Sequence, residues 1–409
     1  MLKINFTNKI YYVILTISLF IGLFFGEDSA GSGGFRLDFS TTWGLVEQPF
    51  RSDLTKYDIK FPLHYYIASF IYLILDDKNL LRTTYCIIAA TIPFIFYKCL
   101  KKKFKNTDIN NLFLFSLIIF LLPSFRAAAI WPNTQITGIL FFLIAIFFYL
   151  SWENKKQFNK INKELFYTIF FMSLTVYTRQ IYALVFFYIL FEFFIRMKTK
   201  TLIKTCFLIF LFSLPGFAYI YYWPRILQAT FDYKLYNTLL INSSIISFYL
   251  IPFFLILEKF KIKKIFFNNQ SFLILIISIA IVAICAIFFD YNFKMGGGFF
   301  IKLSVLLFNN LSLFFITSVI GLYLLCILSL KNKMNILLSI IILFSISAWI
   351  IFQKYFEPMF LLLLFFFYRT NLTKSFLKSK LNICLFHIYF IVYLFSAIVN
   401  DILQLTKNI

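Results

Sequence analysis

Acidic and basic side chains gather in the segments that separate long apolar runs of this sequence. The clearest case is the stretch GEDSAGSGGFRLDF, which follows an apolar run and holds Glu27, Asp28, Arg36 and Asp38. A carboxylate placed there could act as a general base that takes a proton from a hydroxyl group. A cation beside it could stabilise the charge that grows on a departing phosphate. The combination suits the transfer of a sugar from a lipid phosphate to an acceptor hydroxyl.

Further polar residues lie at the ends of other apolar runs and could bind the substrate or its phosphate. These candidates are Arg179, Gln180, Lys60, His64, Arg126, Lys294, Lys354 and Glu357. Arg179 is the strongest, because it lies in an apolar hairpin where a buried arginine needs an anionic partner. Each of the others has a simpler interpretation as a residue that faces water or reaches the lipid head groups.

Membrane helices are the elements that must position these residues. The chain has 409 residues, of which 61% are hydrophobic and 22% aromatic. Apolar runs of roughly 15 to 25 residues, the length of a membrane-spanning helix, recur throughout. The sequence therefore predicts an all-α polytopic membrane protein, with a single transmembrane domain over residues 1–409. We expect about thirteen spans, at 10–25, 83–99, 111–125, 136–152, 165–178, 181–195, 203–223, 238–257, 271–289, 303–329, 335–352, 358–368 and 382–399.

The distribution of charge predicts how the spans are oriented. The formal net charge is +22, and most basic residues form short clusters between apolar runs, as expected for cytoplasmic loops. This pattern argues against nucleic acid as a partner. The clusters face one side only if residues 62–75, too short for a span, form a helix on the outer surface. Residues 26–82 then form a long first outer loop that carries the candidate acids. The six cysteines lack metal-ligand spacing and read as packing residues.

This layout resembles the GT-C superfamily of membrane glycosyltransferases. The resemblance rests on the acidic pair Glu27–Asp28 directly after the first span, on the long first outer loop with a surface helix, and on the number of spans. It implies a hexosyltransferase that takes a sugar from a polyprenyl-phosphate donor and adds it to a lipid-linked or surface glycan at the outer face. It also implies Asp28 as the catalytic base, with Asp38 as the second candidate and Glu27 as the third.

Three segments are similar to the dolichyl-phosphate-glucose α-1,2-glucosyltransferase family. They are YDIKFPLHYYIASFIY (57–72), TRQIYALVFF (178–187) and KYFEPMF (354–360). The sequence departs from that family in the order of the acidic pair, which is Glu-Asp here, and in having Pro62 where the family has two prolines. The identity of the donor sugar is therefore not carried over.

Other functions remain open at this point. A flippase or transporter of lipid-linked saccharides would be expected to show inverted repeats and interrupted helices, and we recognise neither in the sequence. An O-antigen-type polymerase or ligase would be expected to carry its long outer loop late in the chain. A divalent metal ion could join the lipid phosphate, although no set of ligands stands out. We expect a bacterial inner membrane, with an ER membrane as the alternative.

Overall fold

The described part of the chain is built from helices, without a strand. The computed structural model describes residues 4–30, 34–48, 61–156, 158–222, 234–259, 269–291, 296–330, 332–344, 346 and 350–407. Within these ranges the predicted all-α class is confirmed. Seven helices are long and apolar enough to cross a membrane, or eight if one bent pair is counted as a span. The count of about thirteen spans stays a prediction.

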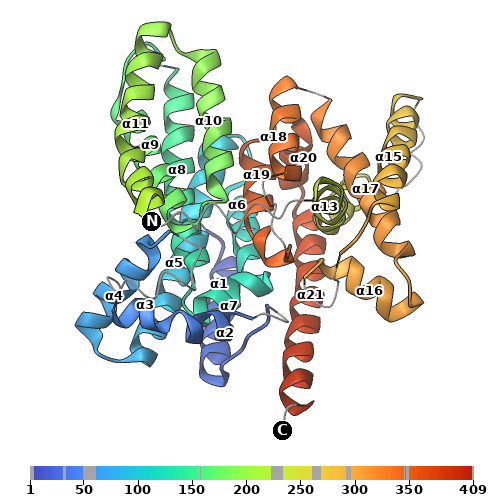
Figure 1. Ribbon diagram of the computed structural model, residues 1–409, viewed down its shortest axis with the longest axis horizontal. Helices are drawn as coiled ribbons and strands as arrows, with labels where there is room; N and C mark the ends of the chain where they lie inside the picture. The colour runs from blue at the N-terminus through green and yellow to red at the C-terminus, as the bar shows by residue number, and fades with distance from the viewer. Residues whose placement is uncertain are drawn as a thin grey trace. The chain divides into compact units, whose positions relative to one another are not determined.

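The chain divides into two compact units. Unit 1 consists of Met1–Ala229 and Phe390–Ile409, and unit 2 of Thr230–Tyr389. The helices of unit 1 are α1 (Phe6–Phe25), α2 (Phe35–Thr41), α3 (Trp43–Glu47), α4 (Leu63–Leu75), α5 (Lys78–Lys103), α6 (Ile109–Ser116), η2 (Leu117–Leu121), α7 (Pro123–Ile130), α8 (Thr134–Lys155), α9 (Lys163–Thr178), α10 (Tyr182–Arg196) and α11 (Thr199–Tyr222) (Figure 1).

Unit 2 has its own set of helices. They are α13 (Leu235–Leu257), α15 (Asn269–Ile287), α16 (Phe299–Phe308), α17 (Ser312–Ser329), α18 (Lys333–Phe344), η3 (Gln353–Tyr355), α19 (Met359–Phe366) and α20 (Asn371–Lys378). Helix α13 packs along α17 at its centre. The long last helix, α21 (Lys380–Lys407), begins in unit 2 and ends in unit 1.

Large apolar side chains remain exposed on the long helices. Phe24 of α1 is 84% exposed, and Phe207 of α11 is 62% exposed. Such surfaces are unfavourable in water but suit contact with lipid tails. Together with the long apolar helices, they support a multi-pass integral membrane protein.

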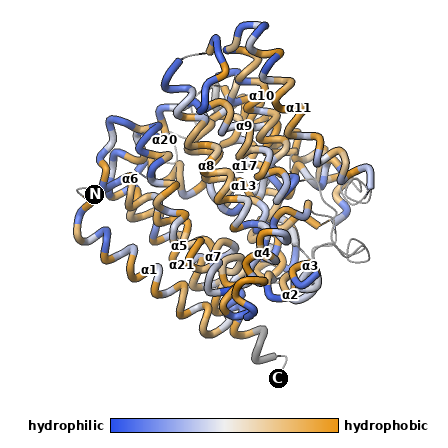
Figure 2. Tube along the Cα trace, turned by 90° about the vertical axis from the view of Figure 1, so that its left-hand side faces the viewer, coloured by the Kyte–Doolittle hydropathy of each residue, from blue (hydrophilic) through white to orange (hydrophobic). Residues whose placement is uncertain are grey.

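The two ends of unit 1 differ in chemistry. Arg82 and Lys102 lie near opposite ends of α5, about 30 Å apart at 1.5 Å per residue, which matches the thickness of a bilayer core. At the lysine end, Asn154 Nδ2 donates to the Lys102 carbonyl (3.2 Å) and Arg196 pairs with Glu153 (2.8 Å). Figure 2 shows hydrophilic residues at the turns before α9 and after α10. The basic clusters of α5, α8 and α10 therefore share one end, as the charge pattern predicts.

Three predicted spans differ in the structure from continuous helices. The run at 111–125 breaks before Pro123, where α6 and η2 meet α7 at an angle of 67°, because proline disfavours helical backbone at the preceding Leu122. The run at 303–329 divides at Asn309, which has left-handed backbone (φ 50°). Around 358–368 the helix α19 has only eight residues, all of them buried. The expectation that no helix is interrupted is wrong.

The segment predicted to lie on the surface does form a separate short helix. Helix α4 has 13 residues, about 20 Å in length, which is too short to span a bilayer. One face packs inward with Tyr65 and Ala68, whereas Leu73 and Ile74 are 76% and 67% exposed. Its position at a membrane surface stays a prediction.

The orientation of unit 1 can be tested by cysteine labelling in intact cells. In a background without the native cysteines, Asn79→Cys lies at the start of α5 and Lys160→Cys in the turn before α9, and both positions are exposed. We expect a membrane-impermeant maleimide to label residue 79 at once and residue 160 only after the membrane is opened. The reverse pattern would contradict the orientation, and labelling of both sites in intact cells would contradict the span count between them.

Candidate active site

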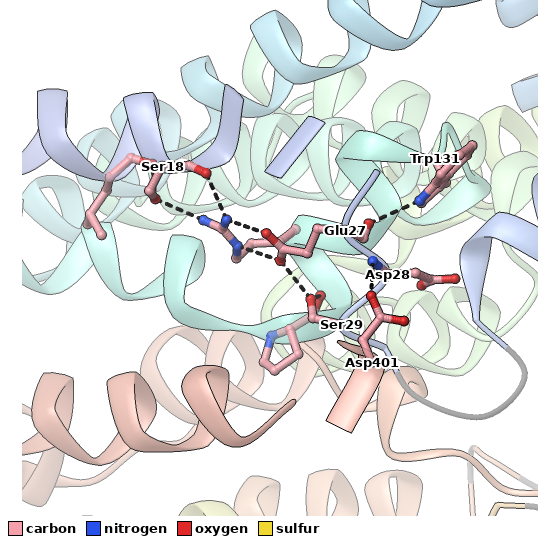
Figure 3. A network of polar contacts seen from close by, with 9 residues as sticks. Ser18, Glu27, Asp28, Ser29, Trp131 and Asp401 are labelled. Atoms are coloured by element: carbon pink, nitrogen blue, oxygen red, sulfur yellow. Dashed lines mark hydrogen bonds and ion pairs between the residues drawn. The ribbon is translucent and has the colours of Figure 1, made fainter. Parts of the chain in front are cut away.

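A sharp turn at the end of α1 directs three polar residues back toward the helices around it. Helix α1 ends at Gly26, which has left-handed backbone (φ 66°) that glycine adopts without strain. The Glu27 N–H then donates to the Gly22 carbonyl (2.8 Å), in the arrangement common at helix C-termini. Glu27, Asp28 and Ser29 follow as a buried polar segment, seen in Figure 3 between neighbouring helices.

Glu27 forms a buried ion pair with Arg126 of α7. Arg126 Nε lies 2.9 Å from Glu27 Oε1, and Nη2 lies 2.6 Å from Oε2, so the contact is bidentate. The remaining donors of Arg126 reach Ser18 of α1, whose hydroxyl and carbonyl oxygens both lie at 3.0 Å. Ser29 Oγ also donates to Glu27 Oε1 (2.9 Å). The ion pair between Glu27 and Arg126 therefore joins the end of α1 to α7.

The backbone of α1 makes room for this pair. A Cβ atom on Gly22 would lie 2.3 Å from Glu27 Oε2 and 3.1 Å from Arg126 Nη2. Only glycine lets the carboxylate and the guanidinium group lie this close to the helix axis. The ion pair thus depends on the missing side chain one turn before the end of α1.

Asp28 faces a different partner, the start of helix α2. Its carboxylate accepts hydrogen bonds from the backbone N–H groups of Phe35 (3.1 Å) and Arg36 (2.9 Å). These groups have no partner within the helix, so the aspartate satisfies them. Its own N–H donates to Asp401 Oδ2 on α21 (2.9 Å), as Figure 3 shows. A Cβ atom on Gly34 would lie 2.1 Å from Asp28 Oδ2, so this approach also requires glycine.

The environment of Asp28 favours the protonated form more than water does. Burial is the largest cause and raises the pKa of the carboxyl group. The hydrogen bonds from Arg36 and Phe35 oppose this rise, and the negative charge of Asp401 adds to it. The net result is a pKa above the ordinary value for aspartate, which makes Asp28 a stronger base once it is ionised.

Two arginines and a tryptophan adjoin the acidic turn. Arg36 donates through Nη2 to the Gly26 carbonyl, and its Cζ lies 5.1 Å from the centre of the Trp131 ring. Arg82 donates through Nε to the Ile130 carbonyl (3.0 Å), and its Cζ lies 3.9 Å from the same ring. Trp131 Nε1 in turn donates to the Glu27 carbonyl (3.0 Å). Carboxylates and cations therefore meet at the end of unit 1 opposite the basic clusters.

None of these contributors was among the predicted binding residues, although Arg36 lies in the acidic stretch where the sequence predicts a cation beside the base. Arg36 stands only eight residues after Asp28, and Trp131 belongs to the polar segment that begins at Arg126. Both could have been chosen from their positions next to selected residues. Arg82 is the last residue of the predicted outer loop and belongs to no local motif, and Asp401 is 373 positions away from Asp28. Nothing in the sequence pairs these two with the turn.

Several predicted substrate-binding residues of unit 1 lie against the start of α8. His64 is buried, and its Nδ1 lies 2.9 Å from Thr137 Oγ1. Arg179 ends α9, and its Cδ would lie 3.8 Å from a Cβ atom on Gly138. Gln180 follows in the turn that leads to α10. His64 thus ties α4 to α8, whereas Arg179 and Gln180 lie in the α9–α10 turn.

The remaining predicted residues are distributed differently. Asp38 lies in α2, one turn after the backbone that Asp28 contacts, and is half-buried. Lys354 and Glu357 belong to unit 2, where Tyr249 donates to Glu357 Oε1 (3.1 Å) and the Lys354 ammonium lies 5.0 Å from the centre of the Phe352 ring. Lys60 and Lys294 lie outside the described residues.

Comparison with known proteins leaves the function to be argued from the site. No protein-family model, curated protein or solved structure matches this chain. Within the described ranges, no group of three His, Cys, Asp or Glu side chains is arranged to hold a metal ion.

The ion pair between Glu27 and Arg126 predicts a specific pattern of stability. Arg126→Met leaves a buried, unpaired carboxylate and should cost about 3–5 kcal/mol in the free energy of unfolding. The double variant Glu27→Met/Arg126→Met removes both charges and should be more stable than the single variant. Thermal unfolding of the purified protein in detergent measures both. An equal loss of stability in the single and double variants would contradict the ion-pair role. No loss of stability in either variant would show that the pair does not stabilise the fold.

Proposed function

We propose that this protein is an integral membrane glycosyltransferase that moves a sugar from a polyprenyl-phosphate donor to a hydroxyl group of a lipid-linked or surface glycan. The observation that carries the proposal is that the buried Asp28 carboxylate, with its raised pKa, contacts the backbone N–H of Arg36, whose side chain stacks with that of Arg82 on Trp131. A base and a phosphate-binding cation are the two groups that this reaction requires.

Asp28 acts as the base in this mechanism. An ionised carboxylate has lone pairs to spare beyond the two backbone bonds that it accepts. It takes the proton of the acceptor hydroxyl while the hydroxyl oxygen forms a bond to the anomeric carbon of the sugar. The bond between that carbon and the phosphate oxygen breaks, and the electron pair stays on the phosphate. Neighbouring guanidinium groups stabilise this charge.

Glu27 and Arg126 position the base in this scheme. Their ion pair holds the first residue of the turn, and Trp131 holds the carbonyl of Glu27. The Asp28 carboxylate is then directed toward α2 instead of toward Arg126. Asp38, in the same short helix, remains the second candidate for the base. Glu27 is the least favoured of the three candidates. A general base needs a carboxylate oxygen that is free to take a proton, and Arg126 contacts both carboxylate oxygens of Glu27.

The broken helix favours a second candidate, a flippase or transporter of lipid-linked saccharides. Interrupted helices that line a binding site are typical of such proteins, and α6, η2 and α7 form one here. The charged residue at the break is Arg126, however, and its donors are engaged by Glu27 and Ser18. A break that is fixed by a satisfied ion pair supports a static scaffold better than a moving gate.

The proposed location follows from the same arrangement. The cluster around Asp28 lies at the end of unit 1 opposite the basic helix ends, which would face the cytoplasm by the positive-inside rule. A polyprenyl-phosphate donor lies in the bilayer with its phosphate at the surface, within reach of this end. We propose the outer face of a bacterial inner membrane as the place of the reaction.

Replacement of Asp28 tests the proposed base. We expect Asp28→Asn to reduce sugar transfer by at least about 100-fold, the usual contribution of a general base, while the protein still inserts and purifies. Mass spectrometry of lipid-linked saccharides and surface glycans gives the readout, in a strain that lacks the native gene. Asp38→Asn, in α2, tests the second candidate and should retain most of the activity if Asp28 is the base.

The outcomes separate the proposals. One sugar missing in the deletion strain, restored by the wild type and not by Asp28→Asn, supports transfer by this base. Full sugar transfer by Asp28→Asn would overturn the assignment. Loss of sugar transfer in Asp38→Asn alone would identify Asp38 as the base. Complete saccharide units that accumulate without a missing sugar would instead support the transporter or polymerase.

The raised pKa of Asp28 predicts the pH dependence of transfer. The base must be ionised, so the rate should fall as the pH drops below its raised pKa. Asp401→Asn removes a negative charge that raises this pKa, while its amide oxygen can still accept the Asp28 N–H. We therefore expect the acid limb of the rate profile to shift to lower pH with a similar plateau. Asp76→Asn removes an exposed charge and, as the control, should leave the acid limb at the same pH. An acid limb that stays in place or shifts to higher pH in Asp401→Asn would contradict the effect of Asp401 on the pKa of Asp28.

A further inference from the structure

Two positively charged groups stack on one indole ring. The Arg36 and Arg82 guanidinium carbons lie 5.1 Å and 3.9 Å from the centre of the Trp131 ring. Contact with the ring stabilises each cation, but the two like charges beside the same ring repel each other in a half-buried place where water screens them poorly. The charge of Asp28 acts on Arg36, and a further anion would offset the remaining repulsion.

Among the described residues, neither guanidinium group pairs directly with a carboxylate. Within the described part of the chain, Arg36 and Arg82 take part in no ion pair. Their acceptors are the neutral oxygens of Gly26, Ile130 and Asn79. Arg126, only five residues before Trp131, shows the opposite case, since its charge is fully paired with Glu27.

Buried donors on both groups are left without an acceptor. Arg36 Nε and Arg82 Nη2 are enclosed by protein and make no hydrogen bond. An unsatisfied buried donor is costly, and such groups are uncommon in folded proteins. Two of them, on two cations that contact the same ring, are donors that a single anion with several oxygens would satisfy.

An aromatic row continues from this pair toward α4. Phe39 lies next to Trp131 (6.0 Å between ring centres), Trp43 next to Phe39 (5.3 Å), and Tyr72 next to Trp43 (5.0 Å). Lys78 adds a third cation, with its ammonium 4.4 Å from the centre of the Trp43 ring. Tryptophan, tyrosine and basic residues together are typical of the zone where lipid head groups meet water.

We propose that Arg36 and Arg82, stacked on Trp131, form a binding site for a phosphate group carried by a lipid. Guanidinium groups bind phosphate oxygens through paired N–H donors. The two unused donors would each find an acceptor there, and the charge of the phosphate would offset that of both cations. The aromatic row, with Lys78 beside it, places the site at the level of lipid head groups.

If the proposed function is correct, the lipid bound at this site is the polyprenyl-phosphate donor. The identity of the lipid therefore rests on the proposed function. Arg36 joins the two parts of the reaction, because its backbone N–H contacts Asp28 Oδ2 and its side chain belongs to the phosphate site. A sugar on the bound phosphate would thus lie near the proposed base. The phosphate residues are then Arg36 and Arg82, ahead of the predicted Arg179 and Lys60.

A purely structural role for the two arginines is the competing explanation. In that case they would only fasten the end of α1 and the start of α5 to Trp131. Such a role needs the hydrogen bonds and the stacking but not the positive charge. Arg82→Gln and Arg36→Gln remove the charge and shorten the side chain, so the unfolding midpoint reports any loss of a structural role and the lipid affinity reports the need for the charge.

Lipid binding without turnover tests the proposal. The purified full-length protein in detergent is titrated with undecaprenyl phosphate, with dioleoylphosphatidylglycerol or with inorganic phosphate, and bound species are counted by native mass spectrometry. We expect undecaprenyl phosphate to bind, and each Gln variant to raise its Kd about tenfold or more, as lost charge-assisted bonds would. Lys160→Gln, at the basic end, removes one charge as the matched control. Arg82→Lys keeps the charge and should lose less affinity than Arg82→Gln. The thermal unfolding midpoint is measured for every variant.

Each outcome decides between the possibilities. Weaker binding in the Gln variants, with an unchanged unfolding midpoint and an unaffected Lys160→Gln, supports the phosphate site. If phosphatidylglycerol shows this dependence and undecaprenyl phosphate does not, the site stands and the proposed donor fails. Dependence for inorganic phosphate alone overturns the lipid, and affinity that is the same in all variants overturns the site. Asp28→Asn should bind normally; if it also transfers sugar normally, the proposed function fails while the site remains.

Discussion

The ion pair between Glu27 and Arg126 is the contact on which the rest of the site depends. It forms where α1 ends and where the segment from α6 to α7 bends, so one interaction fixes two chain breaks at once. A buried ion pair recovers its desolvation cost only when geometry is good and other hydrogen bonds are satisfied. Both conditions hold here, since the contact is bidentate and Ser18 and Ser29 complete it.

Because of this ion pair, the neighbouring residues Glu27 and Asp28 have different roles. Glu27 is neutralised by Arg126 and serves the fold, whereas Asp28 points the other way and holds the first turn of α2 with its carboxylate. Adjacent residues on an extended turn project to opposite sides, so one acid can be structural while the next stays chemically available. The raised pKa of Asp28 follows from the same burial, which outweighs the opposing effects of the backbone hydrogen bonds and of the Arg36 charge.

The charged groups around this turn fall into two kinds. Arg126 is paired with Glu27 and behaves as part of the scaffold, while Arg36 and Arg82 form no ion pair among the described residues and keep unused donors beside Trp131. Evolution toward stability alone would be expected to remove such unsatisfied groups. Their presence next to Asp28 is the physical argument that this end of unit 1 binds an anionic ligand, and it supports the glycosyltransferase proposal over a passive scaffold.

The sequence alone predicts the helical membrane class and the separation of the basic helix ends from the acidic turn, and the structure agrees with both. Apolar run length and charge clustering are local properties that report directly on these features. It also gave α4 correctly as a separate short helix. It was less successful where a helix breaks, since Pro123 and Asn309 divide runs that hydropathy alone joins.

The pairing of the charged residues became visible only in the three-dimensional arrangement of the helices. Glu27 and Asp28 have the same chemistry and adjacent positions, and their roles differ because Arg126 lies 99 residues away in sequence on one side and the start of α2 on the other. Arg82 and Asp401 entered the site without any local signal. Pairing in a low-dielectric interior depends on distances of a few ångströms between elements far apart in sequence, and hydropathy and spacing carry no record of those distances.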